Sequence, residues 1–335
     1  MEKKFANIFK QSISEWRTHI MGVSIFAIML FHQWFFKSNP FPFNVFHNFG
    51  HWGVDIFLFL SGMGLTRSLQ RNSIPMFYKR RFSRIVPSSI VFGTTKYIIF
   101  ILLGSPVIVQ QALNLGVISL ASLDLWFIDT IIILYVLAPL LFKYLNKSPI
   151  STFFCILFIY FSCQYLFSVI VFDRMSPLGL LSWTIRRLPV FSLGMFFSIR
   201  EEWDGKYLYI SIFCFLMAII MAIANKRNLL DPSCYHTTHY LILSIGTPSM
   251  IMLIILLLRT LPCFMLKFLS YLGSFSLELY LIHEFVFCIM NIELTINPLI
   301  LLVSAFSISC FAAYMLNYVK SKITILICQY TKSWI

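Results

Sequence analysis

Apolar residues follow one another in runs of membrane-spanning length along almost the whole chain. The runs cover roughly residues 18–37, 49–66, 86–104, 123–145, 150–172, 183–200, 207–224, 240–260, 266–290 and 297–319. Because a helix needs about 20 mostly apolar residues to cross the hydrocarbon core of a bilayer, each run predicts one transmembrane helix. The pattern therefore predicts an all-α fold: a polytopic membrane bundle of about ten helices.

The composition supports a membrane protein and argues against a nucleic-acid partner. Of the 335 residues, 59% are hydrophobic and 12% are charged, whereas soluble proteins carry about 25% charged residues. The net charge of +13 comes from basic residues in short loops between the apolar runs, as membrane topology requires. No loop is long enough for a soluble domain and no repeat is visible, so residues 1–335 are expected to form a single domain.

The charge distribution predicts an orientation. The first apolar run lacks a small-residue cleavage site, which indicates a retained helix rather than a signal peptide. Ten helices place both termini on one side, and 19 Lys and Arg residues then fall on that side and six on the other. Since cytoplasmic segments are enriched in Lys and Arg, both termini are predicted to be cytoplasmic. The six on the outer side are Lys37, Arg174, Arg186, Arg187, Lys226 and Arg227.

The second apolar run ends on a dense group of basic residues, here called the basic ledge. Its members are Arg67, Arg71, Lys79, Arg80, Arg81 and Arg84. Residues 75–85 alternate apolar and basic side chains, which predicts an amphipathic interfacial helix leading into the third span, with Pro87 in that span's first turn. Arg81 and Arg84 are three residues apart and share a helix face, so together they are able to hold a phosphate. The alternative interpretation is that the ledge sets topology or contacts lipid headgroups.

A few ionisable residues lie inside the apolar runs. Asp55 is in the second run, and His32 and His283 fall at similar depth in the outer half of theirs. Tyr280, Glu278 and Glu284 neighbour His283 in the sequence. Such groups are costly in lipid and are expected to face the interior of the bundle, around a polar cavity. A neutral imidazole there is able to act as a general base, or it is a histidine hydrogen-bonded within the bundle; Glu284 also fits a helix end at the interface.

The eight cysteines lie mostly within apolar runs, and none forms a CxxC pair. Neither a disulfide framework nor a zinc site is indicated, and no metal is expected.

Taken together, several segments resemble the integral membrane acyltransferase family of the O-antigen acetylases, the third acyltransferase family. His32 at the end of the first run resembles the family's helix-one histidine, and GVDIFLFLSG at 53–62 is similar to its Gly-Val-Asp signature. The similarity extends over FYKRRFSRIVP at 77–87, LWFIDTIIILYVLAPLL at 125–141, RRLPVFSLGMFF at 186–197 and YLGSFSLELYLIH at 271–283. The matches occur in the family's order and spacing over almost the whole chain.

The resemblance implies a function. Family members have about ten helices and transfer an acyl group, usually acetyl, from cytoplasmic acyl-CoA to a hydroxyl of a cell-surface or exported carbohydrate. It implies that His32 is the base or acyl relay and that Arg81 and Arg84 contact the phosphates of CoA. Asp55, Tyr280 and His283 complete the expected catalytic set, and Tyr280 or Tyr135 is a candidate donor to the oxyanion. The expected partners are acyl-CoA, a carbohydrate or glycolipid acceptor and the bilayer, in a bacterial inner membrane.

One position departs from the family pattern. The family has an arginine eleven residues before the helix-one histidine, and Met21 occupies that position here. Arg17 is the nearest arginine, one turn lower and about 60° from His32 around the helix. Arg17 either enters the same cavity from the cytoplasmic side or serves only as a topology charge.

Two other functions fit parts of the pattern. A transporter or flippase of a lipid-linked or small anionic substrate also needs intramembrane charges and an interrupted helix, for which Gly246-Thr-Pro248 is the candidate. A non-catalytic partner in polysaccharide assembly is compatible with the departure at Met21.

Overall fold

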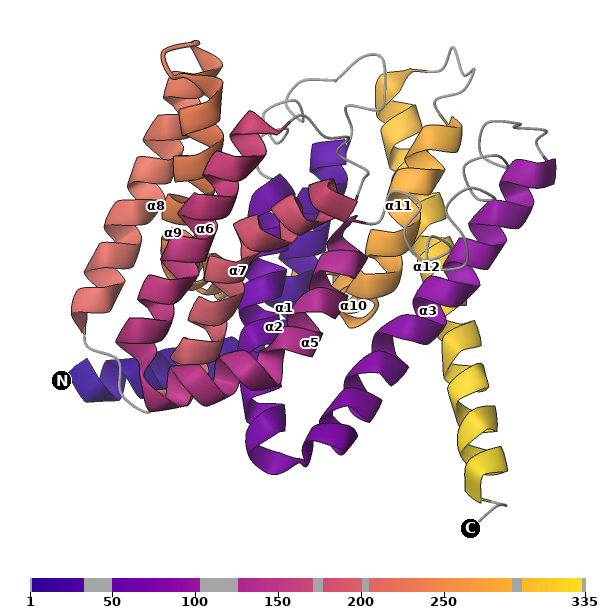
Figure 1. The fold of residues 1–335 in the computed structure, drawn as a ribbon. Helices are drawn as coiled ribbons and strands as arrows, with labels where there is room; N and C mark the ends of the chain where they lie inside the picture. Colours follow the sequence, from indigo (N-terminus) through magenta and orange to yellow (C-terminus); the bar gives the residue numbers. More distant parts are fainter. Residues whose placement is uncertain are drawn as a thin grey trace.

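A computed structural model describes residues 2–32, 50–102, 126–170, 177–200, 205–290 and 297–332, and every regular element in these ranges is helical. The prediction of an all-α fold is therefore confirmed. Figure 1 shows long helices arranged side by side as a bundle. In chain order they are α1 (Glu2–Phe31), α2 (Gly50–Arg71), α3 (Ile74–Leu102), α5 (Trp126–Lys147), α6 (Pro149–Val169), α7 (Pro177–Ile199), α8 (Gly205–Lys226), α9 (Pro232–Leu258), α10 (Cys263–Ser274), α11 (Ser276–Met290) and α12 (Pro298–Lys332).

Five of the described helices are long and apolar enough to cross a membrane, or six if α10 and α11 count as one bent span. The predicted number of about ten stays a prediction. The difference has a physical cause, because several other helices carry polar or charged side chains within their apolar sequence. Asp55 lies in α2 and Arg187 in α7, and each such charge lowers the mean hydropathy of its helix.

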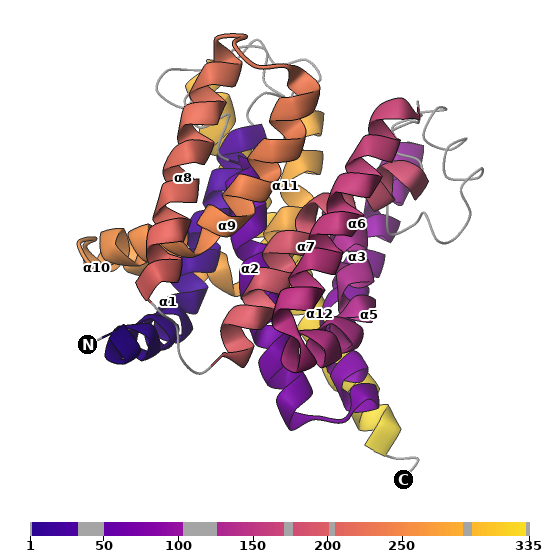
Figure 2. The same cartoon turned by 60° about the vertical axis from the view of Figure 1, so that its left-hand side comes forward.

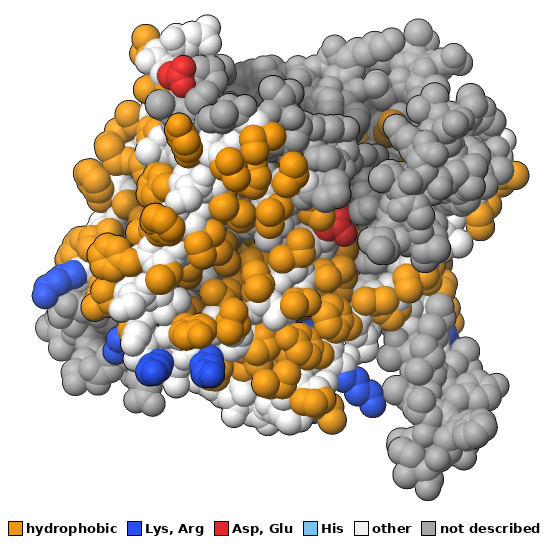
Figure 3. Space-filling view, viewed as in Figure 1, with side chains coloured by type: hydrophobic (Ala, Val, Ile, Leu, Met, Phe, Trp, Pro, Cys, Tyr) orange, Lys and Arg blue, Asp and Glu red, His pale blue; other side chains and the backbone are white. Residues whose placement is uncertain are grey.

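The surface of the bundle has a broad apolar band. Large apolar side chains on α6 and α8 point outward, among them Phe158 and Tyr209, which are 73% and 74% exposed. Figure 3 shows this apolar surface, with Lys and Arg side chains gathered along its lower edge. The start of α1, the end of α12 and the turn between α2 and α3 all lie at this lower end (Figure 1). A band of this kind with a basic rim is typical of a membrane protein; the assignment of the lower end to the cytoplasm stays a prediction.

Two predicted breaks in helices are wrong. Residues 75–85 and the third span form one helix, α3, which contains Pro87 in its interior. Helix α9 likewise continues through Pro248. Next to this proline, the backbone N–H of Ser249 donates to Oγ of Ser211 on α8 over 3.0 Å. Contacts from neighbouring helices of this kind let a membrane helix contain proline without breaking.

The prediction of one continuous helix over 266–290 is wrong, because this segment forms two helices. Helices α10 and α11 meet at an angle of 84°, and Figure 2 shows α10 lying across the bundle next to α1. At the contact, a Cβ on Gly273 would lie 1.8 Å from the carbonyl oxygen of Thr18. Close packing of α10 on α1 therefore needs glycine here, and α11 alone continues along the bundle axis.

Helices α2 and α7 pack closely against each other in the bundle. A Cβ on Gly194 would lie 2.2 Å from the carbonyl oxygen of Phe59, and one on Gly62 would lie 2.3 Å from that of Phe191. Glycines at an interface let two membrane helices approach until their backbones touch. This contact holds α2, which carries both Asp55 and the start of the basic ledge, at a fixed distance from α7.

Substituting Gly194 tests the contact. Gly194→Ala is expected to destabilise the protein by about 1–3 kcal/mol, because the added methyl group forces α7 away from Phe59. The measurement is thermal unfolding in detergent, followed by size-exclusion chromatography. Ser307→Ala, on the exposed side of α12, is the control and should melt like the wild type. Equal melting of Gly194→Ala and the wild type would contradict the tight contact.

Candidate active site

A pocket that is partly open to solvent lies between α1, α2, α3, α5 and α11. It is here called the central pocket. Its lining combines arginines with hydroxyl groups and aromatic rings. The lining residues are Arg17, Met21, Phe57, Leu60, Ser61, Arg81, Arg84, Ile85, Phe127, Ile131, Tyr135, Ser276, Leu277 and Tyr280.

Three arginines, here called the arginine cluster, line the end of the pocket at the basic ledge. Arg17 comes from α1, and Arg81 and Arg84 come from α3. The prediction that Arg81 and Arg84 share one face is confirmed, since both line the same pocket. From the sequence, Arg17 is expected either to enter this cavity or to serve only as a topology charge. Its side chain enters the pocket that Met21 also lines, as the first interpretation predicts.

The guanidinium groups of the arginine cluster carry more N–H donors than the acceptors given for them within the described residues. Arg81 donates from Nη2 to the carbonyl oxygen of Gly64 over 3.1 Å, but its Nε is buried without a partner. Burial is the main cause that lowers the pKa of Arg81, and the neighbouring charge of Arg84 acts in the same direction. No carboxylate among the described residues forms an ion pair with Arg17, Arg81 or Arg84. Guanidinium groups stay charged under these conditions, so the cluster is suited to an anionic ligand with several oxygens.

Tyrosine and serine hydroxyls also line the central pocket. Ser61 and Tyr135 share a hydrogen bond of 3.1 Å. Tyr280 packs with its ring centroid 4.6 Å from that of Phe127 and 5.7 Å from that of His283. The pocket therefore leads from the arginine cluster to a tyrosine that directly contacts a histidine.

The structure brings the two predicted histidines together. Nε2 of His283 lies 3.0 Å from Nδ1 of His32, and the two residues are here called the histidine pair. Nδ1 of His283 lies 2.9 Å from the carbonyl oxygen of Leu279, and Nδ1 of His32 lies 3.0 Å from that of Ile28. The prediction that both histidines lie at similar depth and face the interior of the bundle agrees with this contact.

These contacts determine where the protons are. A carbonyl oxygen only accepts, so the neutral His283 carries its proton on Nδ1 and presents the lone pair of Nε2. His32 in turn carries its proton on Nδ1 and donates it to Ile28 and His283. Nε2 of His32 is then in its basic form. A histidine that is oriented by a second group in this way fits the role of a general base.

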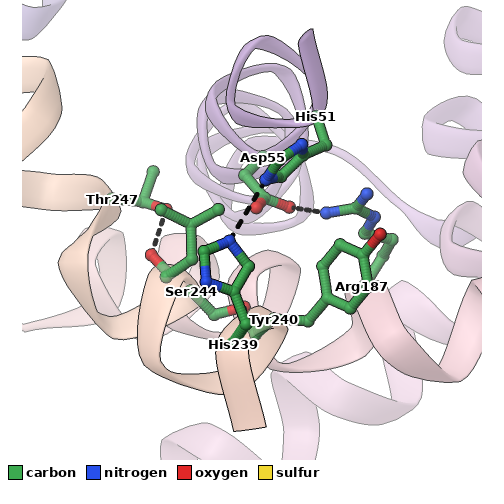
Figure 4. Close-up of polar contacts among 8 residues, drawn as sticks. His51, Asp55, Arg187, His239, Tyr240, Ser244 and Thr247 are labelled. Carbon is green, nitrogen blue, oxygen red and sulfur yellow. Dashed lines mark hydrogen bonds and ion pairs between the residues drawn. The ribbon is translucent and has the colours of Figure 1, made fainter. Parts of the chain in front are cut away.

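Asp55, predicted to be catalytic, lies in a different cluster. Its carboxylate forms an ion pair of 2.5 Å with Arg187 of α7, and both side chains are almost fully buried. Figure 4 shows the pair between α2 and α7, with Tyr240 of α9 beside it. The second carboxylate oxygen of Asp55 has no hydrogen-bond partner. The structure thus gives Asp55 a clear role in pairing a buried charge, and a chemical role stays a prediction.

Around this ion pair lies a second group of polar and aromatic residues, which sequence reasoning missed. The topology count assigned Arg186 and Arg187 to the outer side, and in the structure both lie in the middle of α7. His51 of α2 contacts His239 of α9 with 3.3 Å between their Nε2 atoms, as Figure 4 shows. The available signal was the Arg-Arg pair inside an apolar stretch, since charges within a membrane helix usually face a partner.

Glu278, which neighbours His283 in the sequence, makes its hydrogen bonds to other helices. Glu278 is buried and accepts hydrogen bonds from Ser88 of α3, over 2.9 Å, and from Lys320 of α12. It therefore joins α3, α11 and α12 at a distance from the histidine pair, and its described hydrogen bonds show no contact with His283. Sequence reasoning gave no sign of Lys320 as its partner, because the two residues are far apart in the chain.

Comparison with known proteins identifies the family. An all-helical bundle with an apolar belt and an arginine-lined pocket beside a histidine pair defines a membrane protein with an internal polar site. Residues 19–318 match the model of an acyltransferase domain, so the chain belongs to the family of membrane acyltransferases that includes the O-antigen acetylases. The resemblance noted in the sequence is confirmed. No curated protein and no solved structure matches the chain significantly.

The buried ion pair can be tested by a double-variant cycle. Asp55→Ala leaves the guanidinium of Arg187 buried and unpaired, which is expected to destabilise the protein by about 3–5 kcal/mol. The double variant Asp55→Leu with Arg187→Met removes both charges and should recover most of this loss. Unfolding by denaturant in detergent measures both effects. A single variant as stable as the wild type would contradict the role of the pair.

Proposed function

We propose that this protein is an O-acyltransferase that moves an acyl group, typically acetyl, from cytoplasmic acyl-CoA to a hydroxyl of a cell-surface or exported carbohydrate. The observation that supports it best is the central pocket, which joins an arginine cluster to Tyr280 beside the histidine pair. Membership in a membrane acyltransferase family supports the reaction class. The proposal adds the identity of donor and acceptor.

In this proposal the phosphates of CoA bind the arginine cluster. Arg17, Arg81 and Arg84 provide several charged donors from two helices, and the unpartnered Nε of Arg81 provides one more. Fifteen residues of α1 separate Arg17 from His32, which corresponds to about 22 Å along a helix. The long and narrow pantetheine arm is suited to this distance. It would run along Leu60, Ile131 and other apolar lining residues and place the thioester near Tyr280.

The histidine pair then performs the proton transfers. Nε2 of His32 accepts the proton of the acceptor hydroxyl while the oxygen attacks the thioester carbonyl carbon. The tetrahedral intermediate collapses by breaking the carbon–sulfur bond, and the sulfur of CoA takes the proton back from His32. The products are an ester and the free thiol of CoA. The hydroxyl of Tyr280, which lines the pocket beside His283, is placed to donate to the oxyanion.

The orientation follows from the same proposal. Lys and Arg side chains gather at the lower edge of the bundle (Figure 3), and the turn from α2 into α3, the helix of Arg81 and Arg84, lies at the same end (Figure 1). Cytoplasmic acyl-CoA would enter there. The histidine pair lies deeper, toward the opposite end of α1 and α11. In a bacterial inner membrane the acceptor would then approach from the far side, and the acyl group would cross the membrane on the pantetheine arm.

Two observations weigh against a transporter and an inactive assembly partner. Helix α9 is continuous through Pro248, so it is not the interrupted helix expected of a transporter. Arg17 lines the pocket beside Met21, so the pocket retains a charge from α1. Neither alternative function requires release of the thiol from acetyl-CoA, and thiol release therefore separates them from the proposed function.

The first test concerns donor binding. The double variant Arg81→Ala with Arg84→Ala is expected to weaken CoA binding strongly, since each lost charge-assisted hydrogen bond contributes about 1.5–3 kcal/mol. Calorimetric titration of the purified protein with desulfo-CoA measures the affinity without turnover. Lys79→Ala with Arg80→Ala is the matched control, because it removes two charges from the same helix at exposed positions outside the pocket. Equal losses in both pairs would indicate only a general electrostatic effect.

The second test concerns the histidine pair. His32→Ala should keep CoA binding and lower thiol release from acetyl-CoA by about 10²–10⁴-fold, the usual contribution of a general base. His283→Ala should reduce the rate too, since His32 loses the group that orients it. His19→Ala is the control, as His19 lies on the same helix but lines a separate pocket with α10. Full activity of His32→Ala would disprove its assignment as the base.

A further inference from the structure

A second set of residues, beside Asp55 near the start of α2, is not used by the donor or by the proton transfers. It comprises Trp126, Trp183, Arg186, Arg187 and Tyr240, here called the tryptophan–arginine cluster. Asp55, which anchors it, precedes Gly64 by nine residues of α2, which corresponds to about 14 Å along a helix. Because the carbonyl oxygen of Gly64 accepts from Arg81, the two clusters are separated by about this distance along α2.

Aromatic rings and guanidinium groups alternate in this cluster. The rings of Trp126 and Trp183 lie 5.0 Å apart between centroids at an angle of 32°. Arg186 lies over the rings of Trp183 and Tyr240, at 5.3 and 5.9 Å from their centroids. Arg187 lies over Tyr240 and Trp126, at 4.7 and 5.7 Å. These contacts hold the rings and both charges in one rigid arrangement.

The two arginines have different surroundings. Arg187 is buried and paired with Asp55 (Figure 4), so it forms the floor of the cluster. Arg186 is only half-buried and donates from Nε to the side-chain oxygen of Gln164 over 3.0 Å. Trp126, Trp183 and Tyr240 are half-buried as well. The cluster thus presents partly open aromatic rings next to a positioned guanidinium and an amide.

The cluster is continuous with the central pocket. Trp126 and Phe127 are neighbours at the start of α5, and Phe127 lines the central pocket against Tyr280. A molecule held on the tryptophans would therefore reach the histidine pair from the side opposite to the arginine cluster.

We infer that the tryptophan–arginine cluster binds a sugar ring of the acceptor, an inference that rests on the proposed function. The apolar C–H face of a pyranose packs on an indole ring, while its hydroxyl groups need positioned donors and acceptors at the edge. Trp183 and Trp126 provide the apolar surface, and Arg186 and Gln164 provide the polar edge. Sites for small polar ligands commonly combine aromatic surface with a few positioned polar groups in this way. The guanidinium of Arg186 favours a ring that carries a carboxylate or phosphate.

Glycan binding tests this assignment directly. Purified wild-type protein in lipid nanodiscs is applied to an array of defined neutral and acidic oligosaccharides, and each glycan retained is titrated by tryptophan fluorescence. Trp183→Ala is expected to weaken binding by about tenfold or more, and Trp183→Phe to restore part of it. Arg186→Gln should weaken acidic glycans more than neutral ones. Tyr209→Ala, at a 74% exposed position on α8, is the control and should bind like the wild type.

Titration with desulfo-CoA in the same preparations separates this inference from the proposed function. Wild-type protein that binds desulfo-CoA but retains no glycan, or a Trp183→Ala variant that binds glycans like the wild type, would overturn the acceptor site. Equal losses for acidic and neutral glycans in Arg186→Gln would overturn the role of Arg186. Glycan binding without CoA binding or thiol release would leave the cluster as a sugar site and disprove the transferase proposal.

Discussion

The buried ion pair between Asp55 and Arg187 is the interaction on which both ends of the site depend. Each charge alone would be strongly unfavourable inside the bundle, so the pair is stable only while α2 and α7 stay in register. Gly62 and Gly194 make this register tight, because they let the two backbones touch. With α2 fixed against α7, the basic ledge is held at one end of α2 and the tryptophan–arginine cluster at the other.

The central pocket lies beside this rigid pair. Its walls come from α1, α2, α3, α5 and α11, and they combine guanidinium groups with hydroxyls and aromatic rings. The histidine pair lies next to one of these rings, that of Tyr280. Guanidinium groups are less costly at a membrane boundary, whereas neutral imidazoles tolerate burial.

The charge that α1 contributes to the pocket comes from Arg17, and not from position 21, where the family has its arginine. One turn of helix separates Arg17 from Met21, yet both side chains line the same pocket. A long, flexible arginine side chain is able to span the difference of about 5 Å between successive turns. An arginine one helical turn away is therefore able to place its charge in the same pocket.

The sequence alone determined the all-α fold, the family and the main groups of the central site. Runs of apolar residues identify helices because a bilayer excludes unpaired backbone groups, and rare charges within such runs stand out for the same reason. These signals led to His32, His283, Arg81 and Arg84 by local pattern and resemblance. The structure brings the two histidines into contact and places both arginines in one pocket.

Only the tertiary structure decided which of these groups are partners. Asp55 is paired with Arg187, 132 residues away, and Glu278 with Lys320. It also decided that α10 bends away from α11 and that α9 continues through its proline. The physical reason is that a charge, a glycine or a proline in a helix has several possible environments. The neighbouring helix that supplies a counter-charge, a close backbone or a hydroxyl selects one of them.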